Sequence, residues 1–178
     1  MSSNDREHER QLDTVVVGDV TDFRLVFPAH ADRLRPLAPG DRLDLGGTEL
    51  LVTEAVLRDY ISTRWAFDTK RRVLFTGDGL AYTHYHEVGH CGSVAEEVPD
   101  LNLPDMTALF AELAFGWTRY VDMEPYIERL DRLIFDELDV AIMAPTHGLP
   151  ITDLKLTMPK IREGLRIGSA ARTIGSIK

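Results

Sequence analysis

The sequence has little cysteine, no long hydrophobic run and no concentrated positive charge. Its 178 residues contain one Cys, so no disulfide can form within the chain. No apolar run approaches the roughly 20 residues that a membrane-spanning helix needs. Asp and Glu number 29 against 20 Lys and Arg, which gives a formal charge of -9, and the basic residues form no cluster. The sequence therefore argues against a disulfide framework, membrane insertion and binding to nucleic acid.

The composition is that of one ordinary globular domain. Hydrophobic residues make up 44% and charged residues 28% of a chain long enough for one sizeable core. The first ten residues lack the apolar stretch of a secretory signal, which together with the single Cys predicts a cytoplasmic protein. We expect a disordered, polar N-terminus over residues 1–13, one domain over 14–168 and a flexible tail over 169–178.

Apolar runs predict a sheet in the first half of this domain. A β-branched run at residues 14–18 predicts a buried strand, and residues 42–53 predict a hairpin that turns at a Gly-Gly pair. Two more strands are predicted at 63–67 and 72–76, with a polar turn between them. Strands that follow one another so closely indicate an antiparallel or mixed sheet.

Helical periodicity replaces the strand pattern after Pro99. Apolar residues at helical spacing predict two amphipathic helices, whose apolar stripes we expect to lie in the core. The first stripe comprises Met106, Leu109, Phe110, Leu113 and Trp117, and the second comprises Ile127, Leu130, Leu133, Ile134 and Leu138. A short buried strand at 139–144 and a last helix around 158–167 follow. Together the strands and helices indicate an α/β fold.

Two polar residues directly follow buried strands, at positions where functional sites are commonly built. Asp78 follows the strand at 72–76 and stands between two glycines, and His147 follows the strand at 139–144 and precedes Gly148. A carboxylate and an imidazole are ordinary ligands of Zn or Fe. On spacing alone, a structural role is at least as good an interpretation as metal binding: Asp78 would close a turn, and His147 would bond to a loop carbonyl.

Three segments together resemble the metallo-β-lactamase superfamily. They are GDRLDLGG at residues 40–47, RVLFTGD at 72–78 and APTHG at 144–148, in the order and spacing of that family. The resemblance extends over roughly residues 14–165 and implies an α/β fold of the αββα sandwich type. It also implies that Asp78 bridges two metal ions and that His147 binds the second. The run at 59–78 resembles the flavodiiron branch more closely than the β-lactamases themselves.

The sequence departs from that family in two places. The family's first motif, His-x-His-x-Asp-His, is missing upstream of the strand at 14–18. In the family, this motif supplies the catalytic Asp and most ligands of the first metal. Where the family has a His after the strand at 48–53, the nearest candidate ligand here is Asp59. The resemblance therefore implies a fold that is incomplete at the N-terminus. We expect the DNA upstream of Met1 to encode an in-frame extension with a His-rich loop.

A histidine-rich stretch follows Asp78 and offers further ligands. His84 and His86 share a face if the chain is extended there, and His86 and His90 share a face if it is helical. Two nitrogens are therefore aligned in either conformation. The spacing is not that of a standard zinc site, and Cys91 has no second Cys beside it. A metal site and a polar loop that covers the site are both open interpretations.

The resemblance implies a metal-dependent hydrolase, in which a metal-bound hydroxide attacks a carbonyl or phosphoryl centre of a small-molecule substrate. We predict Asp78 as the catalytic residue and one or two Zn or Fe ions as cofactors. The predicted metal ligands are Asp78, His147, Asp59, His84 and His86. There are two alternatives: a non-catalytic binding or oligomerisation domain of the same fold, and a di-iron redox protein. The protein could also form a homo-oligomer. With so few ligands, any bound metal should be labile.

Overall fold

The chain folds into two units of different size. The structure, a computed structural model, describes residues 15–17, 24–26, 28–84, 92–98 and 100–170. The first unit is Met1–Ala38 and the second is Pro39–Lys178. Every residue that the sequence singles out as a site candidate belongs to the second unit.

The first unit contains a two-stranded parallel sheet. β1 (Val15–Val17) pairs with β2 (Leu34–Pro36), so that Val15 lies opposite Leu34. The 3-10 helix η2 (Pro28–Arg33) leads directly into β2. The strand predicted at 14–18 is confirmed. β2 was not predicted, because a three-residue strand that ends in Pro carries too little apolar periodicity to be recognised.

The second unit is built on a five-stranded mixed sheet with the strand order β3-β4-β5-β6-β7. Its strands are β3 (Arg42–Asp44), β4 (Glu49–Glu54), β5 (Arg64–Asp68), β6 (Val73–Gly77) and β7 (Ile142–Pro145). The first four are antiparallel neighbours, as the predicted hairpins require, and β7 pairs with β6 in parallel. A parallel neighbour needs a long crossover connection, and the chain between β6 and β7 supplies it with helices.

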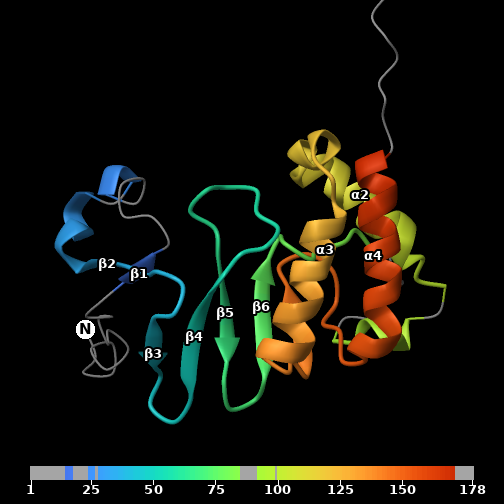
Figure 1. The fold of residues 1–178 in the computed structure, drawn as a ribbon. Coiled ribbons are helices and arrows are strands. Elements are labelled where there is room, and N and C mark those ends of the chain that lie inside the picture. Colours follow the sequence, from blue (N-terminus) through green and yellow to red (C-terminus); the bar gives the residue numbers. More distant parts are fainter. Residues whose placement is uncertain (1–14, 18–23, 27, 85–91, 99, 171–178) are drawn as a thin grey trace, which may run out of the picture. The chain divides into compact units, whose positions relative to one another are not determined.

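The helices gather next to β6, on the side away from β3, β4 and β5 (Figure 1). They are η3 (Ala95–Glu97), α2 (Leu103–Ala114), η4 (Gly116–Tyr120), α3 (Glu124–Asp131), the π-helical turn η5 (Arg132–Glu137) and α4 (Leu154–Ala170). Within the described residues, none of them is both long and apolar enough to cross a membrane.

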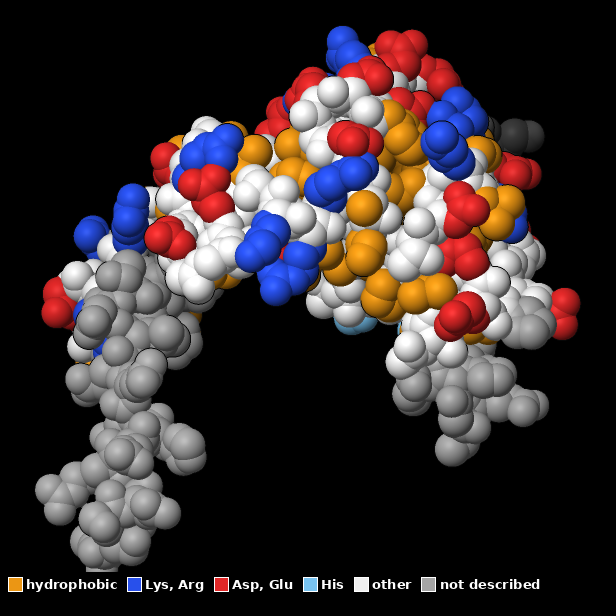
Figure 2. All heavy atoms as spheres, turned by 90° about the horizontal axis from the view of Figure 1, so that it is seen from below, with side chains coloured by type: hydrophobic (Ala, Val, Ile, Leu, Met, Phe, Trp, Pro, Cys, Tyr) orange, Lys and Arg blue, Asp and Glu red, His pale blue; other side chains and the backbone are white. Residues whose placement is uncertain are grey.

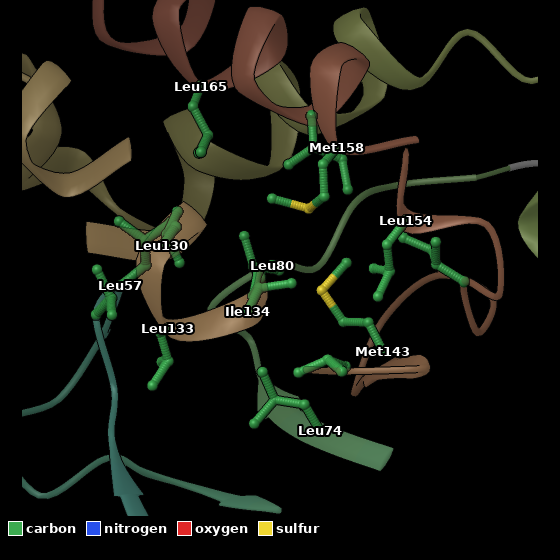
Figure 3. Packing of buried hydrophobic residues seen from close by; sticks show 14 of the residues in the cluster. Leu57, Leu74, Leu80, Leu130, Leu133, Ile134, Met143, Leu154, Met158 and Leu165 are labelled. Atoms are coloured by element: carbon green, nitrogen blue, oxygen red, sulfur yellow. The ribbon is translucent and has the colours of Figure 1, made fainter. Parts of the chain in front are cut away.

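The hydrophobic core lies between these helices and one face of the sheet. Trp65 and Phe67 from β5, Leu74 from β6 and Met143 from β7 lie on this face, and each is at most 5% exposed. Figure 3 shows Leu74 and Met143 directed from the sheet toward Met158 of α4. Burial of these large apolar side chains supplies the main force that holds helices and sheet together.

The first predicted apolar stripe is right in part: Met106, Phe110 and Trp117 pack against the core, whereas two of its leucines do not. Leu109 and Leu113 are 43% and 73% exposed. The buried residues of α2 are instead Leu103, Thr107, Ala108 and Ala111. The cause is the close approach of α4, because a Cβ on Gly164 would lie only 2.5 Å from the carbonyl oxygen of Pro104. Helices this close interlock through small residues, which a search for large apolar side chains does not find.

The other predictions beyond Pro99 hold, with shifted ends. In the second stripe, the buried residues are Ile127, Leu130, Leu133 and Ile134. β7 begins at Ile142 and not at residue 139, because the amide of Val140 still donates to the carbonyl of Ile134 and ends the helix. α4 extends further at both ends than the predicted range.

Asp68 fixes the turn between β5 and β6. Its buried carboxylate accepts hydrogen bonds from Thr48 Oγ1 at 2.6 Å, from the Lys70 amide at 2.9 Å and from the Arg71 amide at 3.0 Å. These bonds, the one from Thr48 above all, hold the pKa of Asp68 well below its usual range. Folding therefore favours the ionised form, and this contribution to stability is present above about pH 4 and is lost as the pH falls further.

We predict that Asp68→Asn lowers the melting temperature at pH 7 by several degrees and flattens the loss of stability below about pH 4. The amide keeps the shape of the side chain but removes its charge and one acceptor. Thermal unfolding followed by circular dichroism at several pH values measures both effects. Asp136→Asn, which makes the same charge change at an exposed site, is the control. Equal melting temperatures and equal acid sensitivity of the two variants would contradict the assignment.

Candidate functional site

Asp78 and His147 meet at one edge of the sheet. Because β6 and β7 are parallel, both residues follow the same ends of neighbouring strands, and Gly77 lies opposite Pro145. The amide of Thr146 donates to the carbonyl of Gly77 at 2.9 Å and joins the two loops. The Nε2 of His147 lies 3.6 Å from Oδ1 of Asp78. One strand pairing thus brings together two residues that are far apart in the sequence.

The distance between His147 Nε2 and Asp78 Oδ1 fits two ligands of one metal ion better than it fits a hydrogen bond. At 3.6 Å it exceeds the ordinary 2.7–3.2 Å range of an N–H···O bond. Two ligand atoms bound about 2.0–2.1 Å from one tetrahedral ion lie roughly 3.3 Å apart. The side chains of His147 and Asp78 are 60% and 28% exposed, so a solute can reach them from the solvent. The pair therefore suits two adjacent ligands of one ion.

Tyr82 holds the loop of His147 in place. Its buried hydroxyl donates to the carbonyl of Leu149 at 2.9 Å and accepts from the amide of Leu149 at 2.8 Å. Burial raises the pKa of Tyr82 to about 12, so the hydroxyl keeps its proton. Gly148, between His147 and Leu149, has a φ of 99°, and a Cβ there would lie 2.7 Å from the Tyr82 ring. Only glycine fits this position.

Two further contacts fix the surroundings of the pair. The ring of Phe110 in α2 packs against the imidazole of His147, with 5.4 Å between the ring centroids. A Cβ on Gly79 would clash with the indole of Trp65, so the loop that carries Asp78 is pressed against the core. An aromatic side chain therefore packs beside each residue of the pair.

Asp59 lines a cavity to which neither Asp78 nor His147 contributes. This cavity has a volume of about 510 Å³, and its lining includes Asp59 together with Trp117, Tyr126 and Arg129, but neither residue of the pair. The Oδ1 of Asp59 accepts hydrogen bonds from the Tyr60 amide at 3.0 Å and from Thr63 Oγ1 at 2.8 Å. The carboxylate of Asp59 thus closes its own loop. Its role as a metal ligand stays a prediction.

Of the three histidines in the stretch directly after Asp78, namely His84, His86 and His90, the structure describes His84. Its ring meets the ring of Tyr82 edge to face, with 6.1 Å between the centroids. His86, His90 and Cys91 lie outside the described residues. Within the described part of the chain, no three His, Cys, Asp or Glu side chains come together in a group that could hold a metal ion. The predicted roles of His84 and His86 as ligands are therefore not tested by the geometry.

Two aromatic residues support the site: Tyr82 was not predicted to do so, and Phe110 was predicted only as part of an apolar stripe. The Tyr82 hydroxyl bonds to a backbone group 67 residues away, and no local pattern marks such a contact. The signal that was available is Gly148, since a Gly beside a candidate ligand suggests a close approach of another group.

We predict that Tyr82→Phe lowers the free energy of unfolding by about 1–3 kcal/mol, because the amide and carbonyl of Leu149 lose their buried partner. Gly148→Ala should destabilise the protein at least as much, since it adds both backbone strain and a clash with the Tyr82 ring. Urea unfolding measures both changes. Tyr120→Phe, at a site that is 85% exposed, is the control and should change stability by less than about 0.5 kcal/mol. A Tyr82→Phe variant as stable as this control would contradict the role of the hydroxyl.

Neither a protein-family model nor a curated protein sequence matches this chain. Solved structures do match it. The flavodiiron protein from Giardia intestinalis is 12% identical at a TM-score of 0.65, over 86% of this chain and 36% of that chain. Rubredoxin oxygen:oxidoreductase from Desulfovibrio gigas is 10% identical at a TM-score of 0.63, over 87% and 37%. A mutant of the flavo di-iron protein from Thermotoga maritima is 12% identical at a TM-score of 0.59, over 87% and 36%.

The chain thus spans little more than a third of the length of these three proteins. Identities this low show the fold and not the activity. The neighbours are flavodiiron proteins, whose N-terminal domain is a metallo-β-lactamase-like fold. The resemblance and the fold class predicted from the sequence are therefore confirmed: this chain has the metallo-β-lactamase-like α/β fold found in flavodiiron proteins.

Proposed function

We propose that this chain is a metal-dependent hydrolase whose metal is held by Asp78 and His147. The observation that carries the proposal is the 3.6 Å separation between His147 Nε2 and Asp78 Oδ1 at the edge of the sheet. Two donors at this spacing suit one ion, and both Zn and Fe accept a carboxylate and an imidazole. The metallo-β-lactamase-like fold supports the same location, since both residues stand in the segments that resemble that family.

Two donors are too few for a catalytic zinc, which normally has three protein ligands. Among the described residues no third candidate joins the pair. We propose that His84 or His86, in the stretch that follows Tyr82, completes the site for one or two ions. Asp59 is the weaker candidate, since its carboxylate is already engaged by Thr63 and by the Tyr60 amide.

When bound, such an ion acts as a Lewis acid and makes a coordinated water a nucleophile at neutral pH. The chain's own residues orient and shield the site. Tyr82 keeps the His147 loop in one position, and Phe110 covers one side of the imidazole. Asp78, which is half-buried, would hold the ion and could accept a proton as the general base of the reaction. The open side of the pair suits a small-molecule substrate with a carbonyl or phosphoryl centre, and a cytoplasmic location is part of the proposal.

A di-iron redox protein is the second candidate, and the structural neighbours favour it. They include rubredoxin oxygen:oxidoreductase and a chemotaxis sensor described with a peroxy diiron species, the latter 17% identical at a TM-score of 0.52 over 88% of this chain and 60% of that chain. Carboxylate and imidazole ligands serve iron as well as zinc. The same pair of residues would then hold iron, and the reaction would transfer electrons without hydrolysis.

We predict that metal binding depends on the pair. Asp78→Ala and His147→Ala should each reduce bound Zn or Fe to less than about half of the wild-type content, since each removes one of few ligands. Elemental analysis after dialysis against the metal measures this. Chelator should remove the ion from the wild type, and faster below about pH 6, because histidine coordinates only as the neutral imidazole. Asp136→Ala, at an exposed carboxylate, is the control. Equal metal content in all four proteins would exclude this site.

We predict that hydrolysis follows metal occupancy. The zinc-loaded and iron-loaded proteins should cleave a nitrophenyl ester or a bis-nitrophenyl phosphodiester, and Asp78→Ala should lower the rate by about 100-fold or more. Oxygen consumption by the iron-loaded protein with a chemical reductant is measured in parallel. Reductant-dependent oxygen consumption without hydrolysis would replace the hydrolase by the redox candidate. A wild type that binds neither metal would leave a non-catalytic domain of the same fold.

A further inference from the structure

The cavity lined by Asp59 has the size of a small-molecule site. Its volume of about 510 Å³ falls within the roughly 300–1,000 Å³ that is usual for ligand pockets. Its lining comes from the loop at 55–61, which follows β4, and from η4 and α3, which supply Trp117, Pro125 and Tyr126. All these residues belong to the second unit, so the cavity lies within one compact part of the chain.

Two aromatic rings give this cavity a fixed apolar surface. Trp117 and Tyr126 pack on each other with 5.2 Å between the ring centroids and 54° between the ring planes. The indole nitrogen of Trp117 donates to the carbonyl of Arg58 at 2.9 Å and so ties the ring to the loop. Because this bond satisfies the one polar atom of the indole, Trp117 offers only apolar surface to a ligand. The two rings therefore favour a ligand with a flat apolar group, which can stack or pack edge to face on them.

Arg129 also lines the cavity, but its charge is already engaged. Its Nε donates to Glu54 at 2.6 Å, and its Nη1 and Nη2 donate to the two carboxylate oxygens of Glu137 at 2.6 and 3.1 Å. All three nitrogens of the guanidinium thus have partners, and Glu54 is neutralised by the same contact. Arg129 and Glu54 therefore form part of the wall, and the lining charges left to act on a ligand are those of Arg58 and Asp59.

Arg58 and Asp59 stand side by side in the loop with opposite charges. Within the described part of the chain, the guanidinium of Arg58 has no hydrogen bond or ion pair, and it does not pair with Asp59. The two hydrogen bonds of the Asp59 carboxylate, from the Tyr60 amide and Thr63 Oγ1, both go to Oδ1. A guanidinium and the second carboxylate oxygen, Oδ2, are therefore open to a ligand at consecutive positions of the lining.

The surroundings do not favour a ligand of one sign. Among the coloured side chains on the side seen from below, Figure 2 shows Lys and Arg interspersed with Asp and Glu. The formal charge of -9 disfavours a simple anion at long range, and Arg58 disfavours a simple cation at the cavity itself. A ligand with one charge would be repelled by either Arg58 or Asp59, whereas a ligand with both charges close together can pair with both residues.

We propose that this cavity binds a free aromatic α-amino acid. The carboxylate of the ligand pairs with Arg58, since a guanidinium can donate two parallel hydrogen bonds to a carboxylate. The ammonium group pairs with Asp59 Oδ2, and the side chain packs on the rings of Trp117 and Tyr126. An α-amino acid carries both charges on one carbon atom, so both can reach consecutive residues of the loop. The bond from Trp117 to the carbonyl of Arg58 keeps the aromatic surface beside these charges.

Calorimetric titration of the full chain with matched ligands tests this assignment. L-tryptophan, L-phenylalanine and L-tyrosine are titrated first, and we expect saturable binding of at least one of them. For L-tryptophan, the analogues are tryptamine, which lacks the carboxylate, indole-3-propionate, which lacks the ammonium group, and L-alanine, which lacks the ring. Each analogue should bind about 10-fold more weakly or worse than the complete amino acid. No binding of the three amino acids at about 10 mM, or an analogue that binds as tightly as its parent, would overturn the proposal.

Two variants assign each charge of the ligand to its residue. Arg58→Gln should weaken L-tryptophan by about 10-fold and leave tryptamine unchanged, because tryptamine has no carboxylate to lose its partner. Asp59→Asn keeps the Oδ1 acceptor for the loop, and it should weaken L-tryptophan and leave indole-3-propionate unchanged. Arg35→Gln and Asp136→Asn, at exposed positions outside the cavity lining, are the matched controls and should bind as the wild type does. Unchanged binding of L-tryptophan by both Arg58→Gln and Asp59→Asn, or equal losses for all ligands, would overturn the proposal.

The same titrations with and without zinc separate this site from the proposed metal site. Since neither Asp78 nor His147 lines the cavity, chelator and Asp78→Ala should leave the affinity for the amino acid unchanged. An affinity that is lost together with the metal would place the amino acid on the metal centre and overturn the proposal. A chain that binds the amino acid but neither Zn nor Fe would instead contradict only the proposed function.

Discussion

The parallel pairing of β6 with β7 is the constraint on which the candidate site depends. It is fastened at both ends: the carbonyl of Arg72 accepts from the amides of Ala141 and Ile142 where the strands begin, and Thr146 bonds to Gly77 where they end. A slip of one residue would turn every β7 side chain to the opposite face and take Met143 out of the core. The register that buries Met143 is therefore the same register that brings His147 to Asp78.

Strand pairing brings the two loops together, and packing then fixes their side chains. The loop of Asp78 leaves β6 through Gly77 at a φ of 53° and is pressed against Trp65 at Gly79. The loop of His147 is tied to the buried hydroxyl of Tyr82, which satisfies both backbone groups of Leu149. Each loop is thus held by contacts with the core, while the pair itself is open to solvent.

The parts of the fold that could be predicted from the sequence are those with local patterns. The hairpin at 42–53 has a Gly-Gly turn between alternating strands, and Asp78 and His147 each follow an apolar run, so their proximity follows once β6 and β7 are neighbours. The α2 face against α4 could not be predicted, because it depends on how closely Gly164 lets the helices approach. The contact between Tyr82 and Leu149 could not be predicted either, because it joins parts of the chain that are 67 residues apart. A resemblance in sequence located two donors, but it could not supply a third where the motif that carries it is missing.

The face of the sheet that points away from the core and the candidate site share strand β6 and are still physically separate. Phe75 points away from the core, whereas its neighbours Leu74 and Thr76 are both fully buried on the core side. The position of β6 is thus set by the core, and the contacts that Phe75 makes add to it without defining it. The packing that sets β6 does not depend on the chemistry of the site, which is why the activity has to be established at the site itself.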